Sequence, residues 1–254
     1  MTPQGGVDCG FVNTNRAGAG VAAARVERES AMVAVIEGLL SKEQVQTVAK
    51  RLFSAKFADG SMSGGPLGKE IKKNTQVAPN SPEYRELADF VLSILKQNET
   101  VALTAIPRRI LPPIFASYTE GHRYGDHVDA ALMGPYPGLR TDLSITIFLN
   151  DPGAYEGGEL VLVTDFGEQI YKRKAGDAVL YPTHYRHRVN PVTKGRRMAV
   201  VTWMESMVRD PARREIIGDL AAVMDRLVTT KGDEELMRMV EKSRLNLLRM
   251  WADT

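Results

Sequence analysis

The sequence Tyr124-Gly-Asp-His-Val-Asp129 decides how the rest of the chain can be interpreted. His127 and Asp129 are separated by one residue, so on a β-strand both side chains would leave the same face, about 7 Å apart along the strand. Such a pair can chelate a metal ion. A later histidine, His187, is a candidate third ligand, and two imidazoles with one carboxylate form the facial triad that holds Fe(II) with open positions for oxygen chemistry.

The bulk composition narrows the class of protein. The chain has 254 residues, 43% of them hydrophobic, which is enough apolar material for a sizeable core. A formal net charge of +2 gives no electrostatic reason to expect nucleic acid or an anionic membrane as a partner. Cys9 is the only cysteine, so an internal disulfide is excluded. Without a signal-peptide pattern or an apolar run of about 18–20 residues, we expect a cytoplasmic protein with no membrane partner.

The patterns divide the chain into four parts: a leader over 1–30, a helix and strand region over 31–109, a core over 110–206 and a helical extension over 207–254. The leader is rich in Gly, Ala, Asn and Arg without a steady period, so we expect it to be mobile. The second part should pack on the core. The C-terminal extension contains two amphipathic helices, which we expect to cover a sheet face or to pair with another subunit as a homodimer.

Cap signals mark two helix starts in the second part. Ser41 with Gln44 three residues later has the capping-box spacing, and Ser81 followed by Pro82 predicts the start of another helix. Between these helices, residues 55–80 predict a long connection, and connections of this length inside a compact domain are usually functional. Four of its side chains could meet a substrate or could simply be solvated: Lys69, Lys72, Lys73 and Asn74.

Short β runs separated by turn residues fill the third part. Strands at this spacing favour a double-sheet jelly roll, whose mouth is a natural place for a small-molecule site. The expected fold class is therefore α+β, with a double-stranded β-helix (jelly-roll) core and flanking N-terminal and C-terminal helices. The strands are expected at residues 113–119, 123–130, 142–149, 158–164, 168–174, 177–182, 185–190 and 197–206.

Arg197 begins the last of these strands, after a turn predicted over residues 191–195. Alternate residues from 197 to 203 share one strand face, which can point into a barrel. An inward arginine with no acidic neighbour in its own strand until Glu205 needs an anion, and its planar fork suits a carboxylate. A salt bridge to an acid elsewhere in the chain is the alternative.

Two other histidines lie near the candidate site. His184 is in the same turn region as His187 and competes with it as the third ligand, but His187 has the better spacing to Arg197 and precedes an apolar and polar alternation. We therefore expect His184 at the rim, where it could contact a substrate. His122, at a turn or strand start, is a second weak candidate for substrate contact.

Further segments occur around these residues in a fixed order: Tyr118 and residues 124–129, 140–150, 155–160, 175–182, 187–197 and 203–210. Together they resemble the bacterial PKHD-type hydroxylases. These belong to the Fe(II)- and 2-oxoglutarate-dependent dioxygenases of the prolyl 4-hydroxylase superfamily. The resemblance extends from about residue 32 to the C-terminus, which is far more specific than an isolated His-x-Asp pair.

The resemblance implies that His127, Asp129 and His187 bind Fe(II), and that Arg197 holds the distal carboxylate of 2-oxoglutarate. Tyr118, nine residues before the first ligand, resembles a tyrosine that helps to seat this co-substrate. The implied reaction is hydroxylation of a C–H bond of an unidentified small-molecule or peptide substrate by O2. In that reaction 2-oxoglutarate is oxidatively decarboxylated to succinate and CO2, and L-ascorbate (vitamin C) is the implied reductant.

One position departs from the family pattern. Some prolyl hydroxylases carry a tyrosine at the place of Phe148, two residues before the turn residue Asn150. Because phenylalanine has no hydroxyl, contact with the distal carboxylate falls to Ser144 or Thr146 on the same alternating face, or to Arg197 alone.

Two other functions remain open at the level of sequence. A non-catalytic sensor on the same fold would bind iron and 2-oxoglutarate and turn over neither. A zinc hydrolase can also use two histidines and a carboxylate, but that function has no use for Arg197 and no evident general base. The presence of Asp129 favours hydroxylation over halogenation, because glycine or alanine at that position would open a place for halide.

Overall fold

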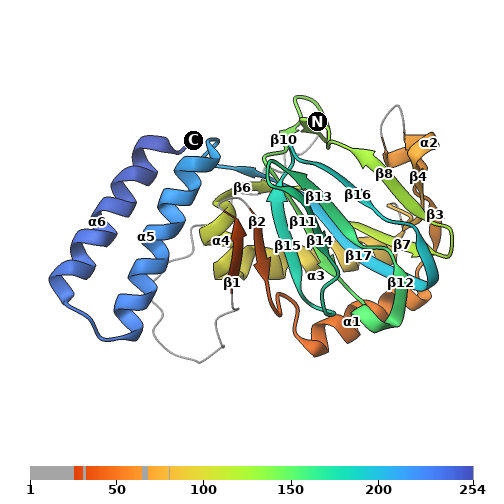
Figure 1. Ribbon diagram of the computed structural model, residues 1–254, viewed down its shortest axis with the longest axis horizontal. Helices are drawn as coiled ribbons and strands as arrows, with labels where there is room; N and C mark the ends of the chain where they lie inside the picture. Colours follow the sequence, from red (N-terminus) through yellow and green to blue (C-terminus); the bar gives the residue numbers. More distant parts are fainter. Residues whose placement is uncertain (1–25, 31–32, 65–67, 80, 254) are drawn as a thin grey trace, which may run out of the picture.

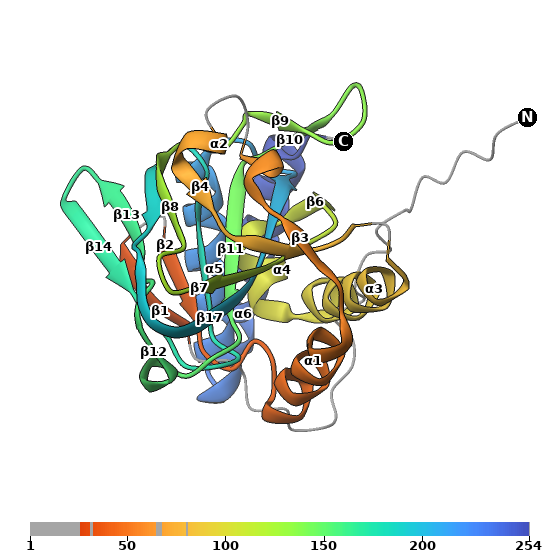
Figure 2. The same cartoon turned by 90° about the vertical axis from the view of Figure 1, so that its right-hand side faces the viewer.

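The computed structural model describes residues 26–30, 33–64, 68–79 and 81–253 (Figure 1). A large and a small antiparallel sheet lie face to face, and helices cover the other side of the large sheet (Figure 2). The small sheet has the strand order β14-β13-β16-β8-β4. Its members are β14 (Gly167–Tyr171), β13 (Leu160–Thr164), β16 (Arg186–Val189), β8 (Arg123–His127) and β4 (Lys72–Lys73).

The large sheet has ten strands in the order β1-β2-β15-β11-β17-β7-β5-β3, with β6 and β12 also paired to β17. This double-sheet arrangement is the expected jelly roll, and each of the eight predicted strands is present within a few residues of its expected bounds. The members are β1 (Val26–Ser30), β2 (Val33–Ile36), β15 (Ala178–Pro182), β11 (Leu143–Phe148), β17 (Val192–Ser206), β7 (Ile114–Thr119), β5 (Thr75–Val77), β3 (Phe57–Asp59), β6 (Pro107–Ile110) and β12 (Tyr155–Gly157).

Both predicted caps of the N-terminal region are confirmed. In α1 (Lys42–Ser54), the Gln44 amide donates to Ser41 Oγ at 3.2 Å while Ser41 N donates to Gln44 Oε1 at 2.7 Å, which completes the capping box. The α3 helix (Pro82–Gln97) starts with Ser81 Oγ accepting from the Tyr84 amide. A short helix that the sequence analysis did not predict, α4 (Glu99–Ala105), follows it.

The strand β11 explains why the core and the site lie on opposite sides of the large sheet. All six of its residues are buried, because helices cover one face and the small sheet covers the other. Leu143, Ile145 and Ile147 belong to the apolar cluster that includes residues of α1 and α3. The alternate residue Phe148 joins a separate cluster with residues of the small sheet. The polar side chain of Thr146 therefore points between the sheets.

The predicted 55–80 connection is built from short elements rather than one open loop. Besides β3, β4 and β5 it holds a 3-10 turn (Ser61–Ser63) and α2 (Gly68–Ile71), and its strands join both sheets. Two other short strands, β9 (Leu132–Met133) and β10 (Leu139–Arg140), form a separate hairpin after β8.

Two predicted boundaries are wrong. The leader predicted over 1–30 lies outside the described residues up to residue 25, but Val26–Ser30 forms β1 and pairs with β2. The turn predicted over 191–195 is absent, because β17 already begins at Val192. Gly195 lies inside that strand opposite Tyr155 of β12, and a side chain there would come within 2.7 Å of the Ala154 carbonyl. Gly195 thus allows β12 to approach β17 closely, and this is why a glycine stands at a position that the sequence pattern predicted to be a turn.

The two C-terminal helices, α5 (Pro211–Thr229) and α6 (Glu234–Trp251), are confirmed with their break at residues 230–233. They stand beside the sheets and do not cover a sheet face (Figure 1). They pack on each other, and α5 packs on α4. The apolar cluster at their base contains Ile106, Val208 and Ile217, with Leu247, Leu248 and Trp251 of α6 against it. Within the described residues, no helix has the length and hydropathy needed to cross a bilayer.

Candidate active site

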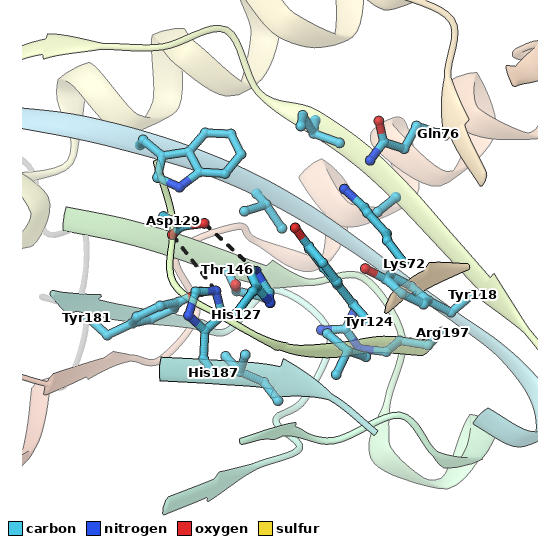
Figure 3. A pocket seen from close by; sticks show the side chains of 16 residues that line it. Lys72, Gln76, Tyr118, Tyr124, His127, Asp129, Thr146, Tyr181, His187 and Arg197 are labelled. Carbon is cyan, nitrogen blue, oxygen red and sulfur yellow. Dashed lines mark ion pairs between the residues drawn. The ribbon is translucent and has the colours of Figure 1, made fainter. Parts of the chain in front are cut away.

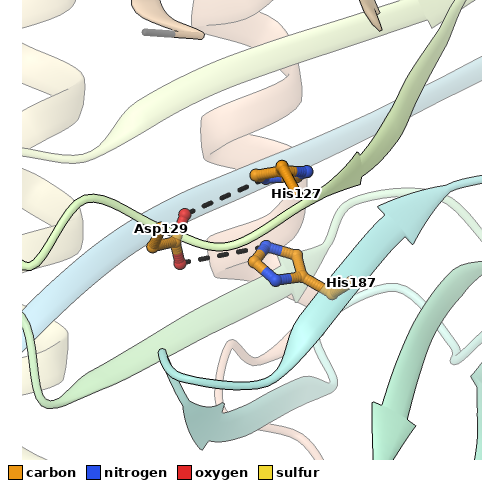
Figure 4. Close-up of side chains that lie close together, drawn as sticks. All are labelled: His127, Asp129 and His187. Carbon is orange, nitrogen blue, oxygen red and sulfur yellow. Dashed lines mark ion pairs between the residues drawn. The ribbon is translucent and has the colours of Figure 1, made fainter. Parts of the chain in front are cut away.

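Strands β8 and β16 bring two of the three predicted ligands together. They are antiparallel neighbours with His127 directly opposite His187, and the ring centroids are 4.2 Å apart. Asp129 lies two residues beyond the end of β8, so it does not share the strand as predicted, yet its carboxylate reaches the same point. Its Oδ1 is 3.9 Å from His127 Nε2 and its Oδ2 is 3.8 Å from His187 Nε2 (Figure 4).

The hydrogen bonds of the two imidazoles aim their free nitrogens at this point. His127 Nδ1 lies 2.9 Å from the Gly125 carbonyl oxygen, and His187 Nδ1 lies 3.0 Å from the Tyr185 carbonyl oxygen. A carbonyl only accepts, so each Nδ1 carries a proton and Nε2 is the nitrogen left for a metal ion. Burial, followed by the neighbouring His187, lowers the pKa of His127 to about 3, which keeps this ring neutral.

The carboxylate completes a set that suits a divalent cation. Burial raises the pKa of Asp129, and its Oδ2 is buried without a hydrogen-bond partner among the described residues. The three ligand atoms lie within 4.8 Å of one another. Two imidazoles whose Nε2 atoms face the carboxylate, and a carboxylate whose Oδ2 has no hydrogen-bond partner among the described residues, fit Fe(II) as its ligands.

Arg197 lies deeper in the same pocket, on the face of β17 that the strand period predicts. Its side chain is only 1% exposed, whereas Arg196 is exposed. The guanidinium lies 5.1 Å from the ring centroid of Tyr118 and 5.7 Å from that of Phe148, and its Nε has no hydrogen-bond partner among the described residues. Asp129 is the one carboxylate among the described residues that line the pocket. A buried cation with aromatic neighbours and no ion-pair partner is a site for an anionic ligand.

The other residues predicted for the site divide into two groups. Tyr118 and Thr146 line the pocket, whereas Ser144 is buried on the same strand face but is not part of the lining (Figure 3). Neither His122 nor His184 lines it. His184 is exposed and packs on the Tyr185 ring, with 4.7 Å between the centroids.

Sequence reasoning missed the part that Tyr124 plays in the site, because a strand period places residues three apart on opposite faces. In the structure Tyr124 stacks on the His127 ring with a centroid distance of 3.6 Å and an interplanar angle of 16°. A β-bulge causes this arrangement. Tyr124 is opposite Val189 and His127 is opposite His187, so β8 contains one residue more than β16 between the two pairs. The extra residue brings both rings to the same side.

Lys72, one of the candidates from the 55–80 connection, does line the pocket. It lies on β4 opposite Tyr124, and its Nζ is 4.6 Å from the centroid of that ring and donates to Ser63 Oγ at 2.8 Å. Burial lowers the pKa of Lys72 to about 8, partly opposed by Asp129. Of the other three candidates, Lys69 and Lys73 are exposed and Asn74 is buried, and none is among the lining residues.

Gln76 and Tyr181 also line the pocket (Figure 3). Trp203 is a third such residue. Trp203 could have been found from the sequence, because it shares the alternating face of Arg197. Gln76 and Tyr181 could not, since the sequence does not reveal which strand ends meet around the ligands.

Known proteins support this interpretation of the fold and the site. The model of the 2OG-Fe(II) oxygenase superfamily matches residues 113–205, which hold all three candidate ligands and Arg197. The fold and the site thus define a 2-oxoglutarate- and Fe(II)-dependent oxygenase. A prolyl hydroxylase from Trichoplax adhaerens, solved with a hypoxia inducible factor peptide fragment, has a similar fold, with a TM-score of 0.50, 15% identity, and coverage of 69% of this chain and 84% of that chain.

Two relatives narrow the class further. A PKHD-type hydroxylase of Saccharophagus degradans is 41% identical over 227 residues, which is 88% of this chain and all of the relative. Another from Thioalkalivibrio sulfidiphilus is 45% identical over 223 residues, which is 87% of this chain and all of the relative. The chain belongs to the PKHD-type hydroxylases.

Proposed function

We propose that this chain hydroxylates a C–H bond of its substrate with His127, Asp129 and His187 as the Fe(II) ligands and with Arg197 as the binding group for the distal carboxylate of 2-oxoglutarate. One observation carries the assignment: the three ligand atoms and an unpaired buried guanidinium share one pocket. Fe(II) held by His127, Asp129 and His187 would supply the oxidising chemistry with O2 that couples decarboxylation of 2-oxoglutarate, to succinate and CO2, to hydroxylation of the substrate.

The chain's own residues prepare the pocket for this reaction. The Gly125 and Tyr185 carbonyls hold the two imidazoles in the tautomer that a metal needs. Arg197, with Tyr118 and Thr146 in the lining, fixes the end of the diacid that does not react. The lining favours these two residues over Ser144 as co-substrate contacts and gives no contact to His122 or His184. Lys72, Gln76 and Tyr124 remain for the primary substrate.

An anaerobic titration of Fe(II) into apo-protein with 2-oxoglutarate tests the ligand set. Bidentate chelation by the oxo acid produces a visible metal-to-ligand charge-transfer band, which we expect in the wild type and in His184→Ala but not in His187→Ala. The two histidines come from the same turn region, so His184→Ala is a matched control. A band that persists in His187→Ala, or that disappears in His184→Ala, would show that the third ligand is assigned wrongly.

Turnover separates an oxygenase from a sensor. We expect the wild type to form succinate from 2-oxoglutarate in air with L-ascorbate, which we propose as the reductant. The His127→Ala variant should form none. Succinate formation no higher than in this variant, despite a normal charge-transfer band, would mean that the chain binds both ligands without turning them over.

We also propose that the C-terminal helices pair two subunits. The supporting observation is that α5 and α6 expose apolar side chains, among them Val223, Leu236 and Met239, which are 46%, 46% and 58% exposed. Light scattering tests this: we expect the wild type to have the mass of a dimer and Leu236→Glu/Met239→Glu to have the mass of a monomer. A monomeric wild type would refute the proposal.

A further inference from the structure

The hydroxyl of Tyr155 is a buried polar group that the assignment above does not use. The Tyr155 side chain is 4% exposed, and its hydroxyl has no hydrogen-bond partner of normal geometry among the described residues. Arg197 Nε is also buried and also has no hydrogen-bond partner among these residues. Both groups can donate a hydrogen bond, and an unsatisfied buried donor costs about 1–3 kcal/mol. Tyr155 is not among the residues that line the pocket, but it lies beside Arg197, which is. Two such donors side by side indicate a missing acceptor.

The backbone brings these two donors together. Strand β12 runs antiparallel to β17 with Tyr155 opposite Gly195, two residues before Arg197. Gly158, at φ +68°, lies between the two side chains, and a Cβ there would be 3.1 Å from both Arg197 Cδ and Tyr155 Cε2. The tyrosine ring and the arginine stem therefore converge in a space that only glycine leaves open.

The surroundings fix the ring and keep it protonated. Lys172 Nζ donates to the Tyr155 carbonyl oxygen at 2.8 Å and lies 4.3 Å from the centroid of the Tyr155 ring. Burial raises the pKa of Tyr155, and Arg197 only partly opposes this through its positive charge and its close contact with the phenol oxygen, a contact that lacks the geometry of a normal hydrogen bond. The phenol is therefore a neutral donor at physiological pH.

The two hydroxyls expected to replace a tyrosine at position 148, those of Thr146 and Ser144, are farther along the strands from Arg197 than Tyr155 is. Thr146 pairs with Val201, four residues from Arg197, and Ser144 pairs with Trp203, six residues away. At the usual rise these offsets are about 13 Å and 20 Å, against about 7 Å for the Tyr155 and Gly195 pair. Tyr155 therefore starts closer to Arg197 than Thr146 or Ser144 does. Tyr118 of β7 is directly opposite Arg197, but its hydroxyl, unlike that of Tyr155, is not among the buried groups that lack a partner within the described residues.

We propose that the Tyr155 hydroxyl is the second donor to the distal carboxylate of 2-oxoglutarate. It would replace the hydroxyl of the tyrosine that some prolyl hydroxylases carry at the place of Phe148. This inference rests on the proposed function, because it presumes that Arg197 binds the same carboxylate. One carboxylate can accept from both groups, which satisfies the two orphaned donors at once.

Calorimetric titration of the Mn(II)-loaded protein with two oxo acids tests the assignment without turnover. The probes are 2-oxoglutarate and 2-oxovalerate, which has the same five-carbon chain with a methyl group in place of the distal carboxylate. In Tyr155→Phe we expect the Kd for 2-oxoglutarate to rise about ten- to hundredfold, the usual range for a hydrogen bond to a charged group. The Kd for 2-oxovalerate should not change.

A matched control and a stability measurement exclude a general effect of losing a phenol oxygen. Tyr84→Phe removes the same atom from a tyrosine that packs on Phe115 in the apolar core on the other face of the large sheet from Arg197, and it should leave both Kd values unchanged. The Tyr155→Phe apo-protein should melt no lower than the wild type, because the variant removes an unsatisfied buried group.

The outcomes separate this inference from the function on which it rests. A wild type that binds 2-oxovalerate as tightly as 2-oxoglutarate would refute the role of Arg197 and the proposed function with it. A preference for 2-oxoglutarate over 2-oxovalerate that is undiminished in Tyr155→Phe, or an equal loss of affinity for both oxo acids, would refute only the role of Tyr155.

Discussion

The buried guanidinium of Arg197 should lower the stability of the apo-protein and at the same time be needed to bind 2-oxoglutarate. Melting curves with and without the ligand can measure both effects. Arg197→Met replaces the charge with an apolar chain of similar length at a site that is 1% exposed. Burying a charge costs several kcal/mol, and the contacts with the Tyr118 and Phe148 rings return about 1 kcal/mol each. Without its ligand, Arg197 should therefore destabilise the native protein.

We expect apo Arg197→Met to be more stable than the apo wild type by about 1–3 kcal/mol, or about 3–9 °C in Tm for a chain of this size. With both proteins loaded with Mn(II), 2-oxoglutarate at about 100 times the wild-type Kd should stabilise the wild type by about 2.7 kcal/mol and the variant by much less, because its Kd is higher. The difference in Tm between the variant and the wild type should then shrink or change sign. Differential scanning calorimetry with and without the ligand measures both effects.

Arg214→Met is the control for this experiment. Arg214 is also buried, but it donates to the carbonyl oxygens of Val208 at 2.7 Å and Arg209 at 2.9 Å, so its removal leaves two acceptors unpaired. We expect that variant to lose about 1–3 kcal/mol. An apo Arg197→Met protein that melts below the wild type, as Arg214→Met should, would mean that Arg197 is already satisfied within the fold, and the reasoning about an absent anion would be wrong.

Three further predictions concern stability. Burial lowers the pKa of Lys72 from 10.5 to about 8, so between pH 8 and 10.5 the unfolded chain binds more protons than the folded one. The charged lysine therefore destabilises the fold at pH 7, and urea denaturation should show Lys72→Met more stable than the wild type by up to about 3 kcal/mol there. The difference in stability should vanish by pH 10.5. Ser41→Ala breaks the capping box with Gln44 and should cost about 1 kcal/mol, seen as a Tm lower by about 2–4 °C; an unchanged Tm would contradict it. Gly176 and Gly167 both have positive φ, but only at 176 would a Cβ collide with a backbone carbonyl, so Gly176→Ala should lose about 1–3 kcal/mol more than Gly167→Ala in the same denaturation assay, and equal losses would show that the backbone relaxes.

Local features of the fold could be predicted from sequence because their causes are local. Ser41 and Gln44 form a capping box through atoms three residues apart, and the turn residues that end the strands act over a few positions. By contrast, the pairing of β12 with β17 joins segments about forty residues apart, and Gly195 has the same residue type whether it makes a turn or admits a crossing strand. The sequence therefore led to a turn where a strand continues through a glycine of positive φ.

The site shows the same division. His127, Asp129, His187 and Arg197 could be identified because their residue types carry the chemistry. Their geometry depends on the register of β8 against β16, and a one-residue bulge there moves Tyr124 to the side of His127 against the strand period. Register between distant strands is set by tertiary packing, so no periodicity in either segment reveals it.

The placement of the C-terminal helices could not be predicted for a related reason. An amphipathic pattern shows that a helix has an apolar partner but does not say which one. Here the partners are the other helix and α4, joined through a small cluster that includes Ile106 and Ile217. A sheet face would have satisfied the same pattern.

The strand order has a consequence for how such an enzyme can evolve. Lys72 lies on β4, which ends the small sheet, and Gln76 lies on β5, next to the end of the large one, whereas Arg197 lies on β17, inside the large sheet. A peripheral strand has fewer neighbours to disturb, so mutations accumulate there at lower cost than in an interior strand. Related enzymes can thus acquire new substrate preferences through mutations at one rim of the pocket while the residues proposed to bind iron and 2-oxoglutarate stay the same.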